Sequence, residues 1–129
     1  MATAKITVVA SFLEAHRNRS ASQISQNSAS NILVHGPGWE IIGLDHYLES
    51  QNRLWKEVPN QQLVAEKVIA TEDEVVVEWL DRAEHPATDG QTRDVITSGC
   101  SIFRFEGEKI SDVAVYADGV DILRQLSNR

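Results

Sequence analysis

Apolar positions in the first half of the chain recur mainly at helical spacing. In ITVVASFL the apolar residues lie three or four positions apart, which predicts an amphipathic helix over roughly residues 2–18. The polar, Ser-rich stretch RSASQISQNSAS follows, and its brevity and its central Ile24 predict a short second helix. NILVHGPGWEIIG then predicts a short strand at residues 31–35, ended by a Gly-Pro-Gly turn. A third helix is predicted from Leu44, Tyr47, Leu48, Gln51 and Trp55.

The second half of the chain has a different period. The segments QLVAEKVIA, EVVVEWLDRA, RDVITSGCSIFRF and KISDVAVYA are rich in β-branched residues, and polar or glycine-containing turns separate them. They predict four consecutive antiparallel strands, and DGVDILRQL predicts a last helix that begins after Asp118. Helices followed by a strand meander indicate an α+β fold, with the N-terminal helices packed on one face of a strongly curved, mainly antiparallel sheet.

Length and charge restrict what such a fold can bind. With 129 residues, of which 42% are hydrophobic, the chain can form one core, so we expect a single domain over residues 1–129. The net charge of -7 disfavours nucleic acid or an anionic membrane as a partner. Cys100 is the one cysteine, and MATAKITVV lacks the apolar run of a signal peptide, so we expect a soluble, cytoplasmic protein.

The element order and the hairpin SIFRFEGEKISDVAVYAD, followed by ILRQL, resemble the SnoaL-like polyketide cyclases. These belong to a wider superfamily that includes nuclear transport factor two, ketosteroid isomerase and limonene epoxide hydrolase. The resemblance covers nearly the whole chain and implies a cone-shaped α+β barrel with a pocket for a hydrophobic small molecule. It also implies a homodimer, for which the outer sheet face with Ile102 and Tyr116 is the expected interface.

Acids occupy only some of the catalytic positions that this resemblance implies. In cyclases and epoxide hydrolases of the superfamily, an acid lies on the last strand three positions before Asp118, and this chain has Val115 there. Asp81 in EWLD matches the aspartate of the epoxide hydrolases, but Trp79 replaces their arginine. The resemblance therefore disfavours classical epoxide hydrolysis, and Asp118 is expected to be a helix cap.

Ketosteroid isomerase provides two further positions. Its general base corresponds to His35 in LVHGPG, and a histidine can carry a proton near neutral pH. Its oxyanion-binding acid corresponds to Ser101, whose hydroxyl is a weaker donor than a protonated carboxylic acid. The tyrosine of its first helix would fall near Ser11 or Phe12, so that donor is missing. Steroid isomerisation is therefore disfavoured.

The alternation of strand residues places Asp81 on the same face as Trp79. An acid enclosed by tryptophan would be desolvated and its pKa raised, which suits general acid or base catalysis. We predict Asp81 and His35 as the proton carriers, although Asp81 could instead pair with Arg93 or Arg104 and His35 could be hydrogen-bonded at a strand end. The predicted substrate contacts are Trp39, Trp55, Trp79, Ser101, Phe103 and Val115.

No cofactor or metal is expected. His16, His46 and His85 lack the spacing of a metal site and are predicted to be exposed or in loops, and HGPGWEIIG lacks the Lys-Ser/Thr pair of a phosphate loop. Two kinds of function remain. One is a cyclase or isomerase that uses general acid/base proton transfer on a hydrophobic substrate, which the tryptophans favour. The other is a non-catalytic ligand-binding or dimeric assembly module, which Val115 favours. We favour the enzyme.

Overall fold

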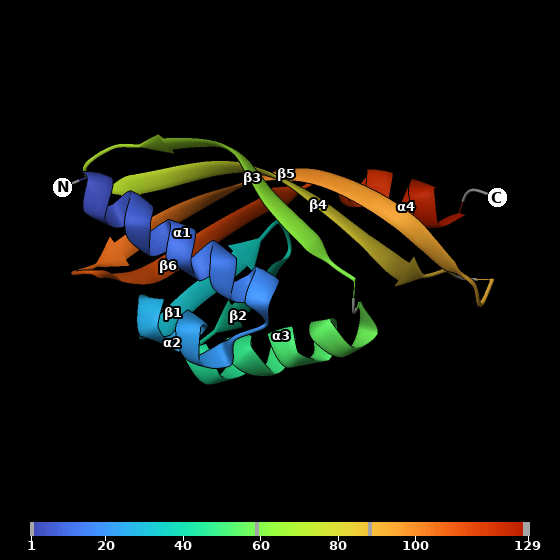
Figure 1. Cartoon of the computed structure of the whole chain (residues 1–129), viewed down its shortest axis with the longest axis horizontal. Coiled ribbons are helices and arrows are strands. Elements are labelled where there is room, and N and C mark those ends of the chain that lie inside the picture. The colour runs from blue at the N-terminus through green and yellow to red at the C-terminus, as the bar shows by residue number, and fades with distance from the viewer. Residues whose placement is uncertain (1, 59, 88, 128–129) are drawn as a thin grey trace.

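A curved sheet in the strand order β2-β1-β6-β5-β4-β3 organises the protein (Figure 1). The computed structural model describes residues 2–58, 60–87 and 89–127. All neighbouring strands in this sheet are antiparallel except β1 and β6, which are parallel. The strands are β1 (Ser28–Gly36), β2 (Trp39–Ile42), β3 (Gln62–Ala70), β4 (Glu74–Pro86), β5 (Thr92–Glu106) and β6 (Lys109–Ala117).

Three N-terminal helices cover the concave side of this sheet, and a fourth follows the last strand (Figure 1). They are α1 (Ala2–Asn18), α2 (Ala21–Asn27), α3 (Leu44–Glu57) and α4 (Gly119–Ser127). The predicted α+β class and the mainly antiparallel, curved sheet are therefore confirmed. In the described part of the chain, no helix combines the length and the apolar character needed to cross a lipid bilayer.

The core lies between α1 and the inner face of the sheet. The rings of Phe12 and Phe103 meet edge to face, with their centroids 5.8 Å apart. Val75 and Val77 of β4 are fully buried beside them. Burying each such side chain contributes about 1.5–3 kcal/mol to the stability of the fold. This packing fixes the distance between helix α1 and the sheet.

One short strand was not predicted. WEII forms β2, which pairs with the end of β1 through the register pairs His35 with Glu40 and Gly36 with Trp39. Gly38 has a φ of 80°, a conformation that glycine adopts without strain, and this lets the chain reverse within two residues. The predicted strand at residues 31–35 is accordingly longer in the structure, and the hairpin brings Trp39 back over the concave face.

The last helix closes an open strand edge. A side-chain oxygen of Asp118 accepts a hydrogen bond from the backbone N–H of Asp121 at 3.0 Å, so Asp118 caps α4 as expected. Because β6 ends at Ala117, opposite Gly99, the residues of β5 before Gly99 have no strand on that side within the described part of the chain. The side chain of Gln125 bonds both the N–H and the C=O of Ile96, at 2.9 and 2.7 Å, in place of a strand.

Candidate active site

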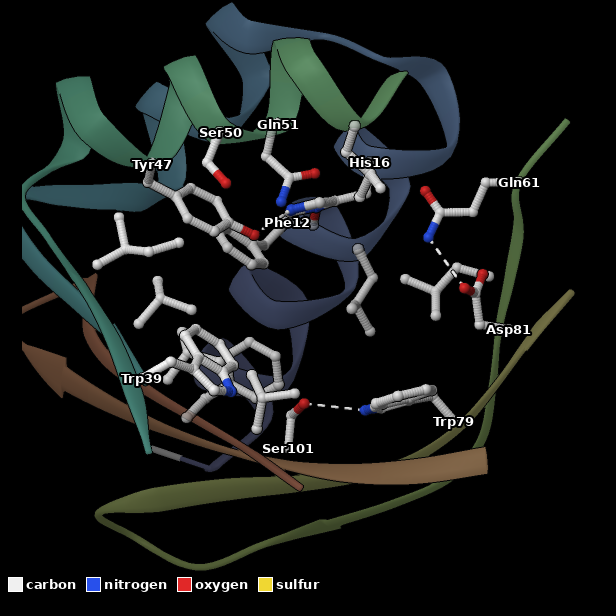
Figure 2. A pocket seen from close by; sticks show the side chains of 18 residues that line it. Phe12, His16, Trp39, Tyr47, Ser50, Gln51, Gln61, Trp79, Asp81 and Ser101 are labelled. Carbon is white, nitrogen blue, oxygen red and sulfur yellow. Dashed lines mark hydrogen bonds between the residues drawn. The ribbon is translucent and has the colours of Figure 1, made fainter. Parts of the chain in front are cut away.

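A cavity of about 400 Å³ lies between the concave face of the sheet and helices α1 and α3 (Figure 2). Its wall is mainly apolar, and the polar groups on it are few and come from different elements. Such a cavity is typical of a site that encloses a small hydrophobic molecule and orients it through a few polar contacts. Six of the predicted site residues lie on its wall: Asp81, Trp39, Trp79, Ser101, Phe103 and Val115.

Two predicted site residues lie elsewhere. Val34 faces the cavity, so the alternation of strand β1 turns His35 to the outer face, where its Nε2 lies 3.0 Å from Oδ1 of Asp112. His35 therefore does not lie beside Asp81, and the expectation that both share one pocket is corrected. Trp55 is 8% exposed and belongs to the core, because the helical turn of α3 presents Leu54 to the cavity instead.

The Asp81 carboxylate is bonded on one side only. Its Oδ2 accepts a hydrogen bond from the amide of Gln61 at 3.0 Å, whereas its buried Oδ1 has no hydrogen-bond partner among the described residues (Figure 2). Desolvation raises the pKa of Asp81, and the Gln61 bond and the charge of His85 oppose this more weakly. One carboxylate oxygen of this cavity-wall residue is therefore desolvated and, among the described residues, has no hydrogen bond.

The alternative in which Asp81 pairs with Arg93 or Arg104 is wrong, because both arginines have other partners. Arg93 pairs with Asp89 and donates to the backbone oxygen of Leu126. Arg104 lies on the opposite face of the sheet, where its Nε is 2.5 Å from Glu74. Both cations are committed elsewhere, and in the described part of the chain the Asp81 carboxylate forms no ion pair.

Two tryptophans of the cavity wall each lie against a glycine of the neighbouring strand. Trp79 is the register partner of Gly99, and Trp39 is the register partner of Gly36. A Cβ atom would lie 2.3 Å from Cζ2 of Trp79 if residue 99 had one, and 2.5 Å from Nε1 of Trp39 if residue 36 had one. Because the two glycines have no Cβ atom, the indoles can lie against the neighbouring strands. The rings therefore leave the cavity open.

Ser101 is oriented by Trp79. The indole N–H of Trp79 donates to the Ser101 hydroxyl oxygen at 2.9 Å (Figure 2). The structure gives the hydroxyl hydrogen of Ser101 no acceptor among the described residues, so it is left to donate into the cavity. Ser101 is 5% exposed, and this shielding from water strengthens any hydrogen bond that it makes to a ligand.

A polar pair on the helical wall was missed at the sequence level. His16 of α1 was predicted to be exposed, but its Nε2 lies 2.7 Å from the hydroxyl of Tyr47 on α3, and both line the cavity. Burial lowers the pKa of His16 to about 4 and raises the pKa of Tyr47. The signal was in the helical period, because His16 follows Phe12 by four positions and Leu13 by three.

No cluster of three or more metal-ligating side chains occurs within residues 2–58, 60–87 and 89–127. Among the described residues that line the cavity, Asp81 is the one carboxylate and His16, on helix α1, is the one histidine (Figure 2). The groups placed for chemistry are thus a desolvated acid, a serine donor and a histidine–tyrosine pair.

Solved structures with this fold are numerous, and three illustrate their range. A candidate polyketide cyclase from Xanthomonas campestris pv. campestris is 16% identical, with a TM-score of 0.88 over 97% of this chain and 98% of that one. An epoxide hydrolase of M. tuberculosis, similar to the limonene enzyme, is 20% identical, with a TM-score of 0.81 over 97% and 90%. A protein from Catenulispora acidiphila with a ketosteroid isomerase-like fold, in complex with trimethylamine, is 15% identical, with a TM-score of 0.79 over 95% and 93%.

Identities this low show a shared fold only. The activities of these proteins are therefore not evidence for the activity of this chain. Among curated proteins, no sequence matches this chain. The family comparison is more specific than the structural ones, because its match extends from residue 7 to residue 126 and so includes every wall of the cavity. This chain belongs to the family of SnoaL-like polyketide cyclases.

Proposed function

We propose that this protein encloses a hydrophobic carbonyl compound and acts on it as a cofactor-independent cyclase or isomerase, with Asp81 carrying the proton. The observation that carries the proposal is the uncommitted, buried Oδ1 of Asp81 on the wall of an apolar cavity. A carboxylate that has lost its water and has no cationic partner is a stronger base than an exposed one. Membership of a cyclase family agrees with this chemistry.

The proposed step is proton abstraction next to a carbonyl group. The ionised Asp81 carboxylate takes a proton from the carbon next to the carbonyl, and the electron pair moves onto the carbonyl oxygen to give an enolate. The Ser101 hydroxyl donates a hydrogen bond to that oxygen, held in direction by Trp79. In a cyclisation the enolate carbon then attacks a second carbonyl carbon, and the oxygen of that carbonyl takes the proton from Asp81 to become a hydroxyl group. In an isomerisation of an unsaturated ketone, the conjugated enolate takes the proton from Asp81 at a more distant carbon, and in both cases Asp81 is ionised again.

A ligand-binding or assembly module is the second candidate. Val115 supports it, because a valine lies on the cavity wall where related cyclases are expected to carry an acid. Such a module would use the same cavity for affinity alone. The pKa of Asp81 distinguishes the two proposals, since a binding module has no need of a carboxyl group whose pKa is raised.

The test is an NMR titration of the Asp81 carboxyl carbon in the ligand-free protein. We expect its pKa to lie above the usual aspartate value of about 3.9 and to shift when 2-acetonaphthone, an apolar ketone, is added. Gln61→Leu serves as a matched variant: it removes the hydrogen bond that lowers the pKa of Asp81, so the pKa should rise further. An Asp81 pKa that lies at or below about 3.9 and does not change when the ketone is added would favour the binding module.

We also propose that the protein forms a homodimer through the outer face of the sheet. Tyr116 and Ile96 on that face are 49% and 46% exposed, and Ile102 lies on it next to Val76 of the neighbouring strand. Covering this apolar surface would stabilise a pair of chains. Light scattering should give twice the chain mass of 14.4 kDa, and Tyr116→Lys should shift the protein towards monomer. A monomer at every concentration would refute the dimer.

A further inference from the structure

The hydrogen-bond directions on the helical wall of the cavity are fixed by one backbone carbonyl. Nδ1 of His16 lies 2.7 Å from the backbone oxygen of Phe12. A carbonyl oxygen can only accept, so Nδ1 must carry the hydrogen. The neutral ring then has a lone pair on Nε2, and the hydroxyl of Tyr47, 2.7 Å away, must donate its one hydrogen to that nitrogen.

Tyr47 is therefore left as an acceptor. A phenol in a cavity wall would ordinarily be read as a donor to a substrate carbonyl, as in an oxyanion hole. Here the one hydroxyl hydrogen is donated to His16, and a lone pair of Oη remains for a ligand in the cavity that Tyr47 lines. The ring of Tyr47 is 7% exposed and stacks on Phe12 at 6.2 Å, so it has little freedom to turn away.

Protonation of the histidine would change these directions, but burial opposes it. The pKa of His16 is lowered to about 4, so the imidazole is neutral at physiological pH. A neutral imidazole whose Nδ1–H donates to the backbone oxygen of Phe12 has no second hydrogen to donate to Tyr47. The chain of donors thus runs in one direction, from Tyr47 to His16 to Phe12.

We infer that Tyr47, oriented by His16, is a specificity-determining residue that accepts a hydrogen bond from a hydroxyl group of the ligand. The opposite wall offers the complementary group, since Ser101 has a hydroxyl hydrogen left to donate. The two walls together select an apolar molecule with a hydroxyl at one end and a carbonyl at the other. This assignment of the substrate class, a hydroxylated carbonyl compound, rests on the proposed function.

The first test needs no ligand. Two-dimensional NMR that correlates the ring nitrogens of His16 with their neighbouring carbon-bound hydrogens identifies which nitrogen is protonated. At pH 7 we expect hydrogen on Nδ1 and none on Nε2, in the wild type and in the Tyr47→Phe variant alike. Hydrogen on Nε2 in the wild type would make Tyr47 a donor to the ligand and would overturn the inference.

The second test compares 2-naphthol, which can donate, with 2-methoxynaphthalene, which can only accept, by NMR titration. Tyr47→Phe should weaken binding of 2-naphthol by about three- to tenfold, the usual value of one neutral hydrogen bond, and leave the ether unchanged. Comparing the same two probes in both proteins cancels their difference in size. Ser30→Ala removes an exposed hydroxyl of β1 that does not line the cavity, and it serves as the control.

The outcomes separate this inference from the proposed function. Equal weakening of both probes by Tyr47→Phe, or no weakening of either, would overturn the acceptor role of Tyr47. An ordinary pKa for Asp81 together with an intact preference for 2-naphthol would overturn catalysis and leave the acceptor role in place. Failure of the wild type to bind either probe would overturn both.

Discussion

Asp81→Asn is expected to slow proton transfer on a bound carbonyl compound by about 10²- to 10⁴-fold, the usual contribution of a general base. Asparagine keeps the shape of the side chain and can still bond Gln61, but it cannot take up a proton. Exchange of the methyl hydrogens of 2-acetonaphthone for deuterium in D₂O, followed by proton NMR, measures this step directly. The exchange needs no knowledge of the natural substrate.

A matched carboxylate provides the control. Asp73 is exposed in the turn between β3 and β4, away from the cavity, so Asp73→Asn changes the net charge equally and should leave exchange unaltered. Undiminished exchange in Asp81→Asn would assign the proton transfer to another group or to solvent. Equal loss in both variants would indicate an effect of charge on the whole molecule rather than a base at Asp81.

The same variant has an expected effect on stability, and its sign follows from the raised pKa of Asp81. At pH values between the unfolded and the folded pKa, the folded protein binds more protons than the unfolded one, so stability falls as the pH rises. Asp81→Asn removes this dependence. In urea unfolding, the free energy of unfolding of the variant relative to the wild type should therefore increase above about pH 4. The difference should become constant at pH values above the folded pKa of Asp81.

The elements that carry the cavity could be predicted because their sequences are periodic. Strands β3 and β6 have the bounds expected from QLVAEKVIA and KISDVAVYA, and the alternation along EVVVEWLDRA put Asp81 and Trp79 on the inner face, where both lie. A period of two fixes which side chains face the same way, and it does so without knowledge of the partner strand.

What could not be predicted depends on contacts between distant segments. His35 was expected in the cavity because of its position in the chain, but strand β1 turns Val34 inwards, and so His35 faces outwards. His16 and Tyr47 are 31 positions apart, and their hydrogen bond depends on how α3 crosses α1. Side-chain polarity at one position says little about such a pair until the packing is known.

The position of Trp79 is another such contact, and it leads to the second large effect. Gly99→Ala is expected to lower the free energy of unfolding by about 1–3 kcal/mol, the usual cost of inserting a methyl group into filled space. The new Cβ would lie 2.3 Å from the Trp79 ring and 2.6 Å from the backbone oxygen of Tyr116. The ring can move aside only into the cavity, and the backbone oxygen belongs to the paired strand β6.

Moving the indole has a consequence for the site as well as for stability. Trp79 would lose its hydrogen bond to Ser101, and its indole would occupy part of the cavity. 2-Acetonaphthone should therefore bind more weakly. Urea unfolding and NMR titration measure the two effects. Gly119→Ala is the control, because a Cβ there meets nothing within 4 Å, and its stability should be unchanged or slightly higher. If Gly99→Ala behaved like this control in both measurements, the tight contact between Trp79 and β5 would be refuted, and with it the account of how the cavity is kept open.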